Sequence, residues 1–255
     1  MLRAVSAPEP DALPVDRAKT ELRKRCWQAI RDAGAARFPG VEGRIPNFVG
    51  AEAAARALAA TELFDAAGVL KCNPDSPQRP VRHAALKAGK LLYVPAPKLA
   101  EEAPFLELDP AVLEPNQLWA ASSIKGAFAL GRPVTVDQMR PLDLIVTGCV
   151  GVTRQGARLG KGGGYSDLEF ALLAEQGLVD ACTPIVTTVH ACQVLPDGHV
   201  PMTEHDISLD GFATPDGFVS CDRPFARPDG VLPEHLPPAK RDAIPALHGR
   251  RAAEE

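Results

Sequence analysis

The stretch LDLIVTGCVGVTRQGARLGKGGGYSDLEFALLAEQG, residues 142–177, contains the parts of one recurring structural unit. Its first part, residues 142–152, is almost continuously apolar, which predicts a buried strand. A glycine-rich loop follows, and after it the apolar spacing of residues 165–177 predicts an amphipathic helix. A strand that leads through a glycine loop into a helix is typical of proteins with a parallel sheet.

Helices and strands continue to alternate on both sides of this unit. An apolar stripe behind the N-cap candidate Asp16 predicts a helix over residues 16–34, and alanine richness predicts another over 51–60. The remaining elements are a helix over 76–89, a buried strand over 90–97, and one or two strands within 181–195. This order predicts an α/β/α sandwich of three layers with a largely parallel sheet.

The two ends of the chain differ in composition from its middle. Residues 1–15 contain three prolines and no apolar periodicity, which predicts a flexible N-terminal arm. From residue 227 onward proline and charge dominate, which predicts a disordered or loosely docked tail over 227–255. Residues 16–226 are then long enough to form one α/β domain with a large core.

Charge and hydropathy argue against two classes of partner. The 28 basic and 32 acidic residues give a formal net charge of −4 without a basic block, so nucleic acid is not expected as a partner. No stretch approaches the roughly 18 apolar residues of a membrane span, and the first residues do not form a signal peptide. Six cysteines without a CxxC pair indicate reduced thiols, so we expect a cytoplasmic protein.

The glycine loop has the composition of an anion site. Where a strand meets a helix N-terminus, unpaired backbone N–H groups and the positive end of the helix dipole lie together, which suits phosphate. Glycines allow close approach of the backbone, and Arg158 and Lys161 add positive charge. The spacing matches neither a P-loop, because Gly162 follows Lys161, nor a dinucleotide fingerprint, because Tyr165 stands where its last glycine is required. A glycine-rich connection without a ligand is the alternative.

Residues 158–167, RLGKGGGYSD, resemble the R-L-G-[RK]-G-x-G-Y-Y-D signature of 5-formyltetrahydrofolate cyclo-ligases, also called 5,10-methenyltetrahydrofolate synthetases. Within the family, the sequence is more similar to the branch of methenyltetrahydrofolate synthase domain-containing proteins, through segments 44–55, 73–78 and 188–194. Three other segments resemble the family in the same order, so that the resemblance covers residues 18–215: AKTELRKR (18–25), GKLLYVP (89–95) and VPMTEHDISLDGFATP (200–215).

This resemblance implies an ATP- and Mg²⁺-dependent ring closure on a small-molecule substrate, in a fold of the NagB/RpiA/CoA-transferase type. Positioning and charge neutralisation would do most of the catalytic work. The signature implies that Lys19 and Arg23 bind phosphates from the first helix, and that Arg158 and Lys161 do so from the loop. It further implies that backbone N–H groups of the loop bind phosphate, that Tyr165 lines the site, and that Asp167 holds Mg²⁺. The loop glycines concerned are Gly160, Gly162, Gly163 and Gly164.

Several positions depart from the family pattern, and they concern the second substrate more than ATP. Ser166 stands in place of the second tyrosine of the signature, and Pro77 in place of the folate-binding glutamate. Residues 148–153 lack the proline, phenylalanine and aspartate of the family's P-G-x-x-F-D turn. Asp75 and Gln78 flank Pro77 and offer replacement polar groups. A non-folate N-formyl or carboxyl substrate therefore stays open, as does a paralogue that binds nucleotide without turnover and serves as a regulatory or interaction module.

Three other groups of residues have both a functional and a structural interpretation. His205 and Asp206 have the composition of a general base with its orienting carboxylate, although such a pair more often stabilises a turn. His190 and Cys192 alternate along a predicted strand, but no second ligand pair completes a metal site. No nearby histidine activates Cys149, which is expected to be buried as part of the core.

Overall fold

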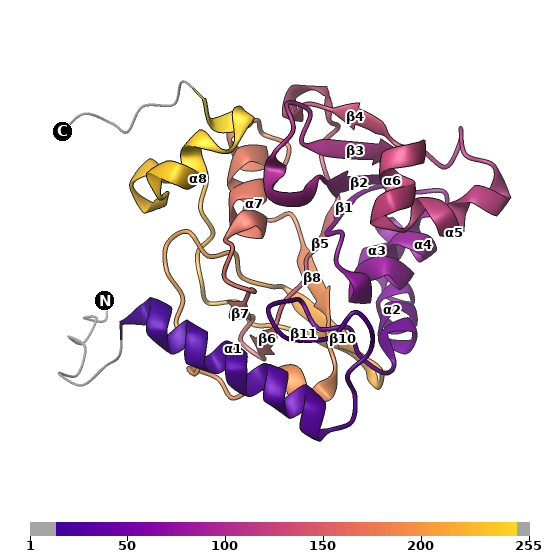
Figure 1. The fold of residues 1–255 in the computed structure, drawn as a ribbon. Coiled ribbons are helices and arrows are strands. Elements are labelled where there is room, and N and C mark those ends of the chain that lie inside the picture. Colours follow the sequence, from indigo (N-terminus) through magenta and orange to yellow (C-terminus); the bar gives the residue numbers. More distant parts are fainter. Residues whose placement is uncertain (1–13, 249–255) are drawn as a thin grey trace.

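The computed structural model describes residues 14–248 (Figure 1). All but the last two residues of the predicted N-terminal arm lie outside this range, as do residues 249–255 of the predicted tail. No helix in the described range is both long enough and apolar enough to cross a bilayer.

Eight strands of the described chain form one sheet in the order β11-β10-β8-β5-β1-β2-β3-β4. Its five central strands, from β10 to β2, run parallel, and the three strands at its edges are antiparallel to their neighbours. The parallel strands are buried on both faces, which explains their continuous apolar runs. The bounds are β1 Val69–Cys72, β2 Leu91–Pro95, β3 Phe105–Leu108, β4 Arg132–Val134, β5 Leu144–Val146, β8 Ile185–Thr188, β10 Gly211–Thr214 and β11 Gly217–Ser220.

Five helices cover one face of this sheet. The helix α2 packs on β10 and β11, α4 on β1 and β2, and α6 on β3. Leu70 and Cys72 alternate with Val69 and Lys71 along β1, so that the first two side chains face these helices and the other two face the opposite layer. The five helices are α2 Ala51–Ala59, α3 Glu62–Ala66, α4 Arg79–Lys87, α5 Leu118–Ala121 and α6 Ile124–Leu130.

The opposite layer consists of α7, Tyr165–Glu175, and a small sheet of β7, Arg158–Leu159, β6, Gly151–Thr153, and β9, Val194–Leu195. The helix α1, Val15–Asp32, lies outside the small sheet and buries Cys26, Trp27 and Ile30 against it (Figure 1). Helices on both sides of a mostly parallel sheet confirm the predicted three-layer α/β/α fold. The connections include the short helical turns Ser76–Gln78, Pro97–Leu99, Pro115–Gln117, Val136–Gln138 and Ala191–Gln193.

Two local predictions are wrong in detail. The single strand expected over 142–152 is two strands, β5 and β6, which belong to different sheets. The chain turns between them at Gly148, where an added Cβ would lie 3.0 Å from side-chain atoms of both Asp75 and Ile45. The helix α7 is not amphipathic, because every residue from 167 to 173 is buried between the main sheet and neighbouring segments.

The C-terminal region differs from the expectation of a disordered or loosely docked tail. Residues 228–248, which we call the C-terminal strap, contain the turns Pro233–His235 and Pro245–Leu247 with α8, Pro238–Asp242, between them. Ile244 and Leu247 are buried against Leu168 and Leu172 of α7, which lie on the side of α7 turned away from the sheet. The apolar residues of the strap have no helical period because they reach α7 from turns separated by prolines.

Packing of the strap on α7 predicts a stability effect. Ile244→Ala should lower the free energy of unfolding by about 2–5 kcal/mol, because it deletes a buried side chain between two elements. Val112→Ala is the control, since Val112 is 78% exposed and should change stability by no more than about 0.5 kcal/mol. Urea unfolding measures both, and equal effects of the two variants would contradict the packed strap.

Candidate functional site

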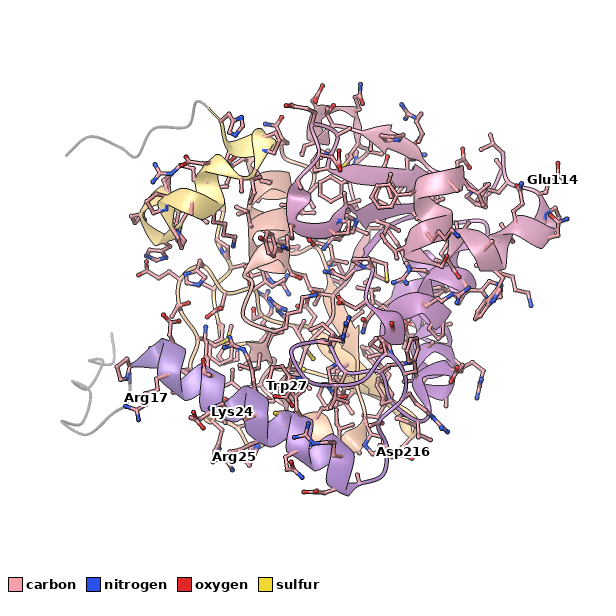
Figure 2. The ribbon with its side chains drawn as sticks, viewed as in Figure 1. Arg17, Lys24, Arg25, Trp27, Glu114 and Asp216 are labelled. Atoms are coloured by element: carbon pink, nitrogen blue, oxygen red, sulfur yellow. The ribbon has the colours of Figure 1, made fainter. Side chains whose placement is uncertain are left out.

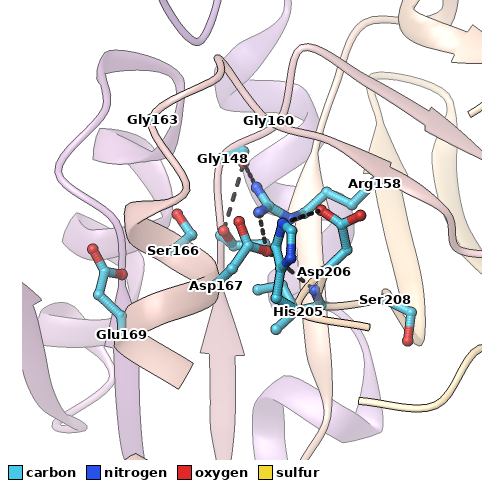
Figure 3. A network of polar contacts seen from close by, with 12 residues as sticks. Gly148, Arg158, Gly160, Gly163, Ser166, Asp167, Glu169, His205, Asp206 and Ser208 are labelled. Atoms are coloured by element: carbon cyan, nitrogen blue, oxygen red, sulfur yellow. Dashed lines mark hydrogen bonds and ion pairs between the residues drawn. The ribbon is translucent and has the colours of Figure 1, made fainter. Parts of the chain in front are cut away.

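The glycine loop, residues 160–164, joins β7 to α7 and lies beyond the carboxyl ends of the central strands, where α/β proteins commonly bind ligands (Figure 3). Gly162 and Gly164 have φ of 101° and 60°, in the left-handed region that favours glycine. The predicted strand–loop–helix unit is therefore present, but Arg158 belongs to the strand β7 and not to the loop itself.

Each glycine of the loop lies against a side chain that a Cβ would crowd. Three of these side chains are cationic and the fourth is the ring of Tyr165. The absence of side chains on the loop therefore lets charged groups come close to its backbone. An added Cβ would lie 3.2 Å from Arg158 Nη1 at Gly160, 3.3 Å from Arg23 Cζ at Gly162, 2.9 Å from Tyr165 Cδ2 at Gly163, and 3.0 Å from Lys240 Nζ at Gly164.

Two cations from opposite ends of the chain hold the carbonyl groups of the loop. Arg23 Nε, on α1, donates to Gly160 O at 2.8 Å, and Lys240 Nζ, on α8, donates to Gly163 O at 2.8 Å. Arg23 was predicted from the sequence, whereas Lys240 was missed because its segment was expected to be a tail. The only sequence signal was a lysine within apolar residues of the strap.

The amide groups of the loop are unpaired within the described chain, in contrast to the carbonyl groups of Gly160, Gly163 and Gly164. No described residue accepts a hydrogen bond from the amides of residues 160–164, and no side chain caps the N-terminus of α7. The backbone therefore keeps the positive ends of its peptide dipoles available beside the helix terminus. This combination favours an anion at the loop.

A buried ion pair joins the two ends of the loop. Arg158 Nη2 lies 2.7 Å from Asp167 Oδ1, and Arg158 Nη1 donates to Gly148 O at 3.1 Å (Figure 3). Burial raises the pKa of Asp167, but Arg158 and the N–H of Ile207 outweigh it, so that this pKa lies below its ordinary value. Within the described chain, Arg158 Nε is buried without a partner and Asp167 Oδ2 accepts no hydrogen bond.

Two further cations are paired with carboxylates close to the loop. Lys161 Nζ lies 3.0 Å from Asp75 Oδ1 and remains partly exposed. Lys19 turns inward from α1, and its ammonium lies 2.5 Å from Asp206 Oδ2. Lys19 is thus connected to the site by its ion pair with Asp206. The other basic residues Arg17, Lys24 and Arg25 of α1 are exposed and point away from the body of the protein (Figure 2).

A small pocket of about 70 Å³ lies between α7 and the strap. His205 and His235 form one wall of it, with their Nδ1 atoms 3.0 Å apart, so that one imidazole donates to the other. His205 is 4.0 Å from Asp206, which instead accepts from Lys19 and Thr203. The remaining lining includes Gly164, Asp167, Leu168, Ala171, Leu232, Leu236 and Lys240.

A polar network connects β1 to the first turn of α7. The buried Lys71 forms an ion pair with Glu169, and its ammonium also donates to Asn73 Oδ1 at 2.9 Å. Because the carbonyl of Asn73 faces Lys71, its amide faces Ser166 and donates to Ser166 Oγ at 2.9 Å. Burial raises the pKa of Glu169, although Lys71 opposes this effect. Ser166, which departs from the family signature, is therefore held in place from the sheet.

The segment around Pro77 is buried at the same edge of the sheet. Gln78 is fully buried, and its Nε2 donates to Thr188 Oγ1 at 3.2 Å at the end of β8. Gln78 Oε1 is buried without a partner in the described chain, whereas Asp75 is engaged with Lys161. Of the two residues that flank Pro77, Gln78 thus has a free acceptor.

The remaining candidates have structural roles. His190 caps the turn Ala191–Gln193 and accepts from the N–H of Cys192 at 3.3 Å, so the predicted strand is wrong at this position. No cluster of three potential metal ligands occurs in residues 14–248. Cys149 is buried, and burial raises the pKa of its thiol to about 12, which confirms its place in the core.

Comparison with known proteins identifies a family and a shared fold. A sequence model of the 5-formyltetrahydrofolate cyclo-ligase family matches residues 15–215. The methenyltetrahydrofolate synthase domain-containing protein of Mus musculus is 35% identical over 93% of the chain, and that of Homo sapiens is 33% identical over 97% of it. The chain spans 64% of the length of each of these two proteins. The NMR structure of Aquifex aeolicus 5,10-methenyltetrahydrofolate synthetase shares the fold, with a TM-score of 0.51 and 21% identity over 82% of the chain and 95% of that structure.

The buried pair of Lys71 and Glu169 predicts a pattern of stabilities. Lys71→Met should lower the free energy of unfolding by about 3–5 kcal/mol, because Glu169 is left buried without its counter-charge. The double variant Lys71→Met, Glu169→Leu should recover much of this loss. Urea unfolding checks both, and a double variant no more stable than the single one would refute the explanation.

The pair of Arg158 and Asp167 predicts a pH dependence. Because the pKa of Asp167 is lowered in the folded state, its contribution to stability is complete above the unfolded pKa of about 4 and is lost as the pH falls below that value. Asp167→Asn should be less stable at neutral pH and should lose less stability on acidification. Glu169 titrates in both proteins, so the difference between their unfolding curves isolates Asp167. Parallel curves would contradict the assignment.

Proposed function

The chain belongs to the 5-formyltetrahydrofolate cyclo-ligase family, and on that premise we propose that it is an ATP- and Mg²⁺-dependent cyclo-ligase. Its proposed reaction is the closure of 5-formyltetrahydrofolate to 5,10-methenyltetrahydrofolate, or the same dehydrative chemistry on another small N-formyl or carboxyl compound. The observation that carries the proposal is the convergence of cations on a glycine loop whose amides have no acceptor among the described residues and whose carbonyls at Gly160 and Gly163 are bound by Arg23 and Lys240.

The residues of the loop fit a nucleotide and its metal. Free amides and the N-terminus of α7 suit phosphate oxygens, and Arg158 Nε is a buried donor that lacks an acceptor. Asp167 Oδ2 is a carboxylate oxygen free of hydrogen bonds, which is the ligand type that Mg²⁺ prefers. ATP would supply the phosphoryl group that makes the formyl oxygen a leaving group, while Mg²⁺ would neutralise phosphate charge.

The chain's own residues would bind and position the reactants. Lys161 is the most exposed of the loop cations, and it would exchange Asp75 for a phosphate when nucleotide binds. Arg158 would hold Asp167 in a single orientation, and its Nε–H, which has no acceptor in the described chain, would donate to a phosphate oxygen. Tyr165, packed against Gly163, would form a wall beside the loop. Such positioning is the main way in which proteins accelerate phosphoryl transfer.

The residues expected to contact the second substrate do not determine which compound that substrate is. Pro77 is buried and offers no donor, and Ser166 presents a small hydroxyl where the family has a ring. Gln78 supplies a buried acceptor beside Pro77. A folate or a smaller N-formyl or carboxyl compound is therefore the proposed substrate class, and a cytoplasmic location stays a prediction.

One assay tests the activity. Protein, ATP, Mg²⁺ and 5-formyltetrahydrofolate should release phosphate and form methenyl absorbance in step. Lys161→Ala should lower kcat/KM by about tenfold to a hundredfold, because a charged contact to phosphate is lost. Lys125→Ala is the control, since Lys125 is an exposed residue of α6, which packs on β3.

The two signals separate the alternatives. Phosphate release without methenyl product would indicate an ATP site with uncoupled turnover, and silence of both signals would direct the search to other N-formyl and carboxyl substrates. ATP binding without release of phosphate would favour the non-catalytic nucleotide-binding module. An undiminished rate for Lys161→Ala would contradict the role of the loop. Asp167→Ala is not suited to this test, because it would leave the buried Arg158 without its counter-charge.

A further inference from the structure

The C-terminal strap reaches the glycine loop although it lies outside the residues that the family model matches. The family match ends at residue 215, and the strap comprises residues 228–248. Lys240, on α8 of this strap, lies against Gly163, Gly164 and Tyr165. The strap therefore adds a cation to a site whose other parts come from the family-matched region.

The surroundings of Lys240 differ from those of the paired cations at the loop. Lys19, Arg158 and Lys161 each have a carboxylate partner, whereas Lys240, like Arg23, has no carboxylate within ion-pair distance among the described residues. Its ammonium donates to Gly163 O at 2.8 Å, and that is its one hydrogen bond within residues 14–248. Since an ammonium has three donors, two remain for another acceptor.

The position of Lys240 is fixed by packing on both sides. Ile244 and Leu247 anchor the strap to α7, and the ring of Tyr165 lies beneath the ammonium, with its centroid 4.7 Å away. Burial lowers the pKa of Lys240, and Asp167 and Glu169 offset this only in part. A half-buried ammonium with unused donors beside free backbone amides is suited to an anionic group.

We propose that Lys240 is a phosphate-binding residue, so that the strap completes the anion site of the glycine loop. This inference rests on the proposed nucleotide function and extends it to a residue outside the range of the family model. Arg23 and Lys240 would then act as a pair that holds the loop by its carbonyls from both sides. Lys240, whose ammonium has two donors without a partner among the described residues, would also bind the phosphate chain directly.

The test measures binding, by isothermal titration with Mg²⁺ present, of ATP and of inorganic tripolyphosphate. Lys240→Gln should weaken both by about tenfold to a hundredfold, because one charged contact is removed. Lys240→Arg should restore most of the affinity, and Lys125→Gln should bind like the parent protein. Thermal unfolding of each variant accompanies the titrations, so that loss of binding is separated from loss of the strap.

Three outcomes would overturn the inference in distinguishable ways. If the parent protein binds neither ATP nor tripolyphosphate, the proposed function fails and this inference fails with it. If the parent binds both and Lys240→Gln binds equally well, the strap is a structural clasp and the nucleotide proposal stands alone. If Lys240→Gln loses affinity only in step with its melting temperature, and Lys240→Arg loses it equally, the role of Lys240 is structural.

Discussion

The ion pair of Arg158 and Asp167 is the interaction on which the candidate site depends. It joins Arg158, two positions before the loop, to Asp167 in the first turn of the helix that follows the loop. Both side chains are buried. The pair thereby closes the loop at its base, while the guanidinium also holds Gly148 at the turn between the two sheets. Breaking such a pair is costly because it leaves an uncompensated charge in the interior. This one pair therefore links the loop, the turn between the two sheets and the first turn of α7.

Around this base, the loop separates its two kinds of backbone group. Carbonyls at Gly160 and Gly163 are bound by Arg23 and Lys240, which come from α1 and α8 near opposite ends of the described chain. The amides are left unpaired beside the N-terminus of α7. A loop rich in glycine has little stiffness of its own. These two clamps explain how a flexible sequence can present a defined set of donors, as preorganised anion sites require.

Local patterns in the sequence predicted most of the fold and singled out Arg158 and Lys161, because a strand, a glycine loop and a helix follow one another without interruption, whereas Lys19 and Arg23 were predicted from the family resemblance. Arg158 was predicted as a loop residue and lies on β7 because a two-residue strand has no periodic signal. The break at Gly148 depends on Asp75 and Ile45, which are distant in sequence. Lys240 was missed for a similar reason, since prolines and charges hide the few apolar contacts that dock the strap. Such nonlocal contacts determine where the chain turns but leave no periodic trace in it.

The second half of the site follows from the orientation of one amide. Lys71 is an obligatory donor, so Asn73 must turn its carbonyl toward Lys71 and its amide toward Ser166. Ser166 then accepts from Asn73, and its own hydroxyl proton has no acceptor among residues 14–248. This hydroxyl stands next to Tyr165, at the position where the family places a second ring. Through Asn73, the buried pair of Lys71 and Glu169 is thus connected to the first turn of α7. Where the family has a second aromatic ring, this chain has a serine whose oxygen is held from the sheet.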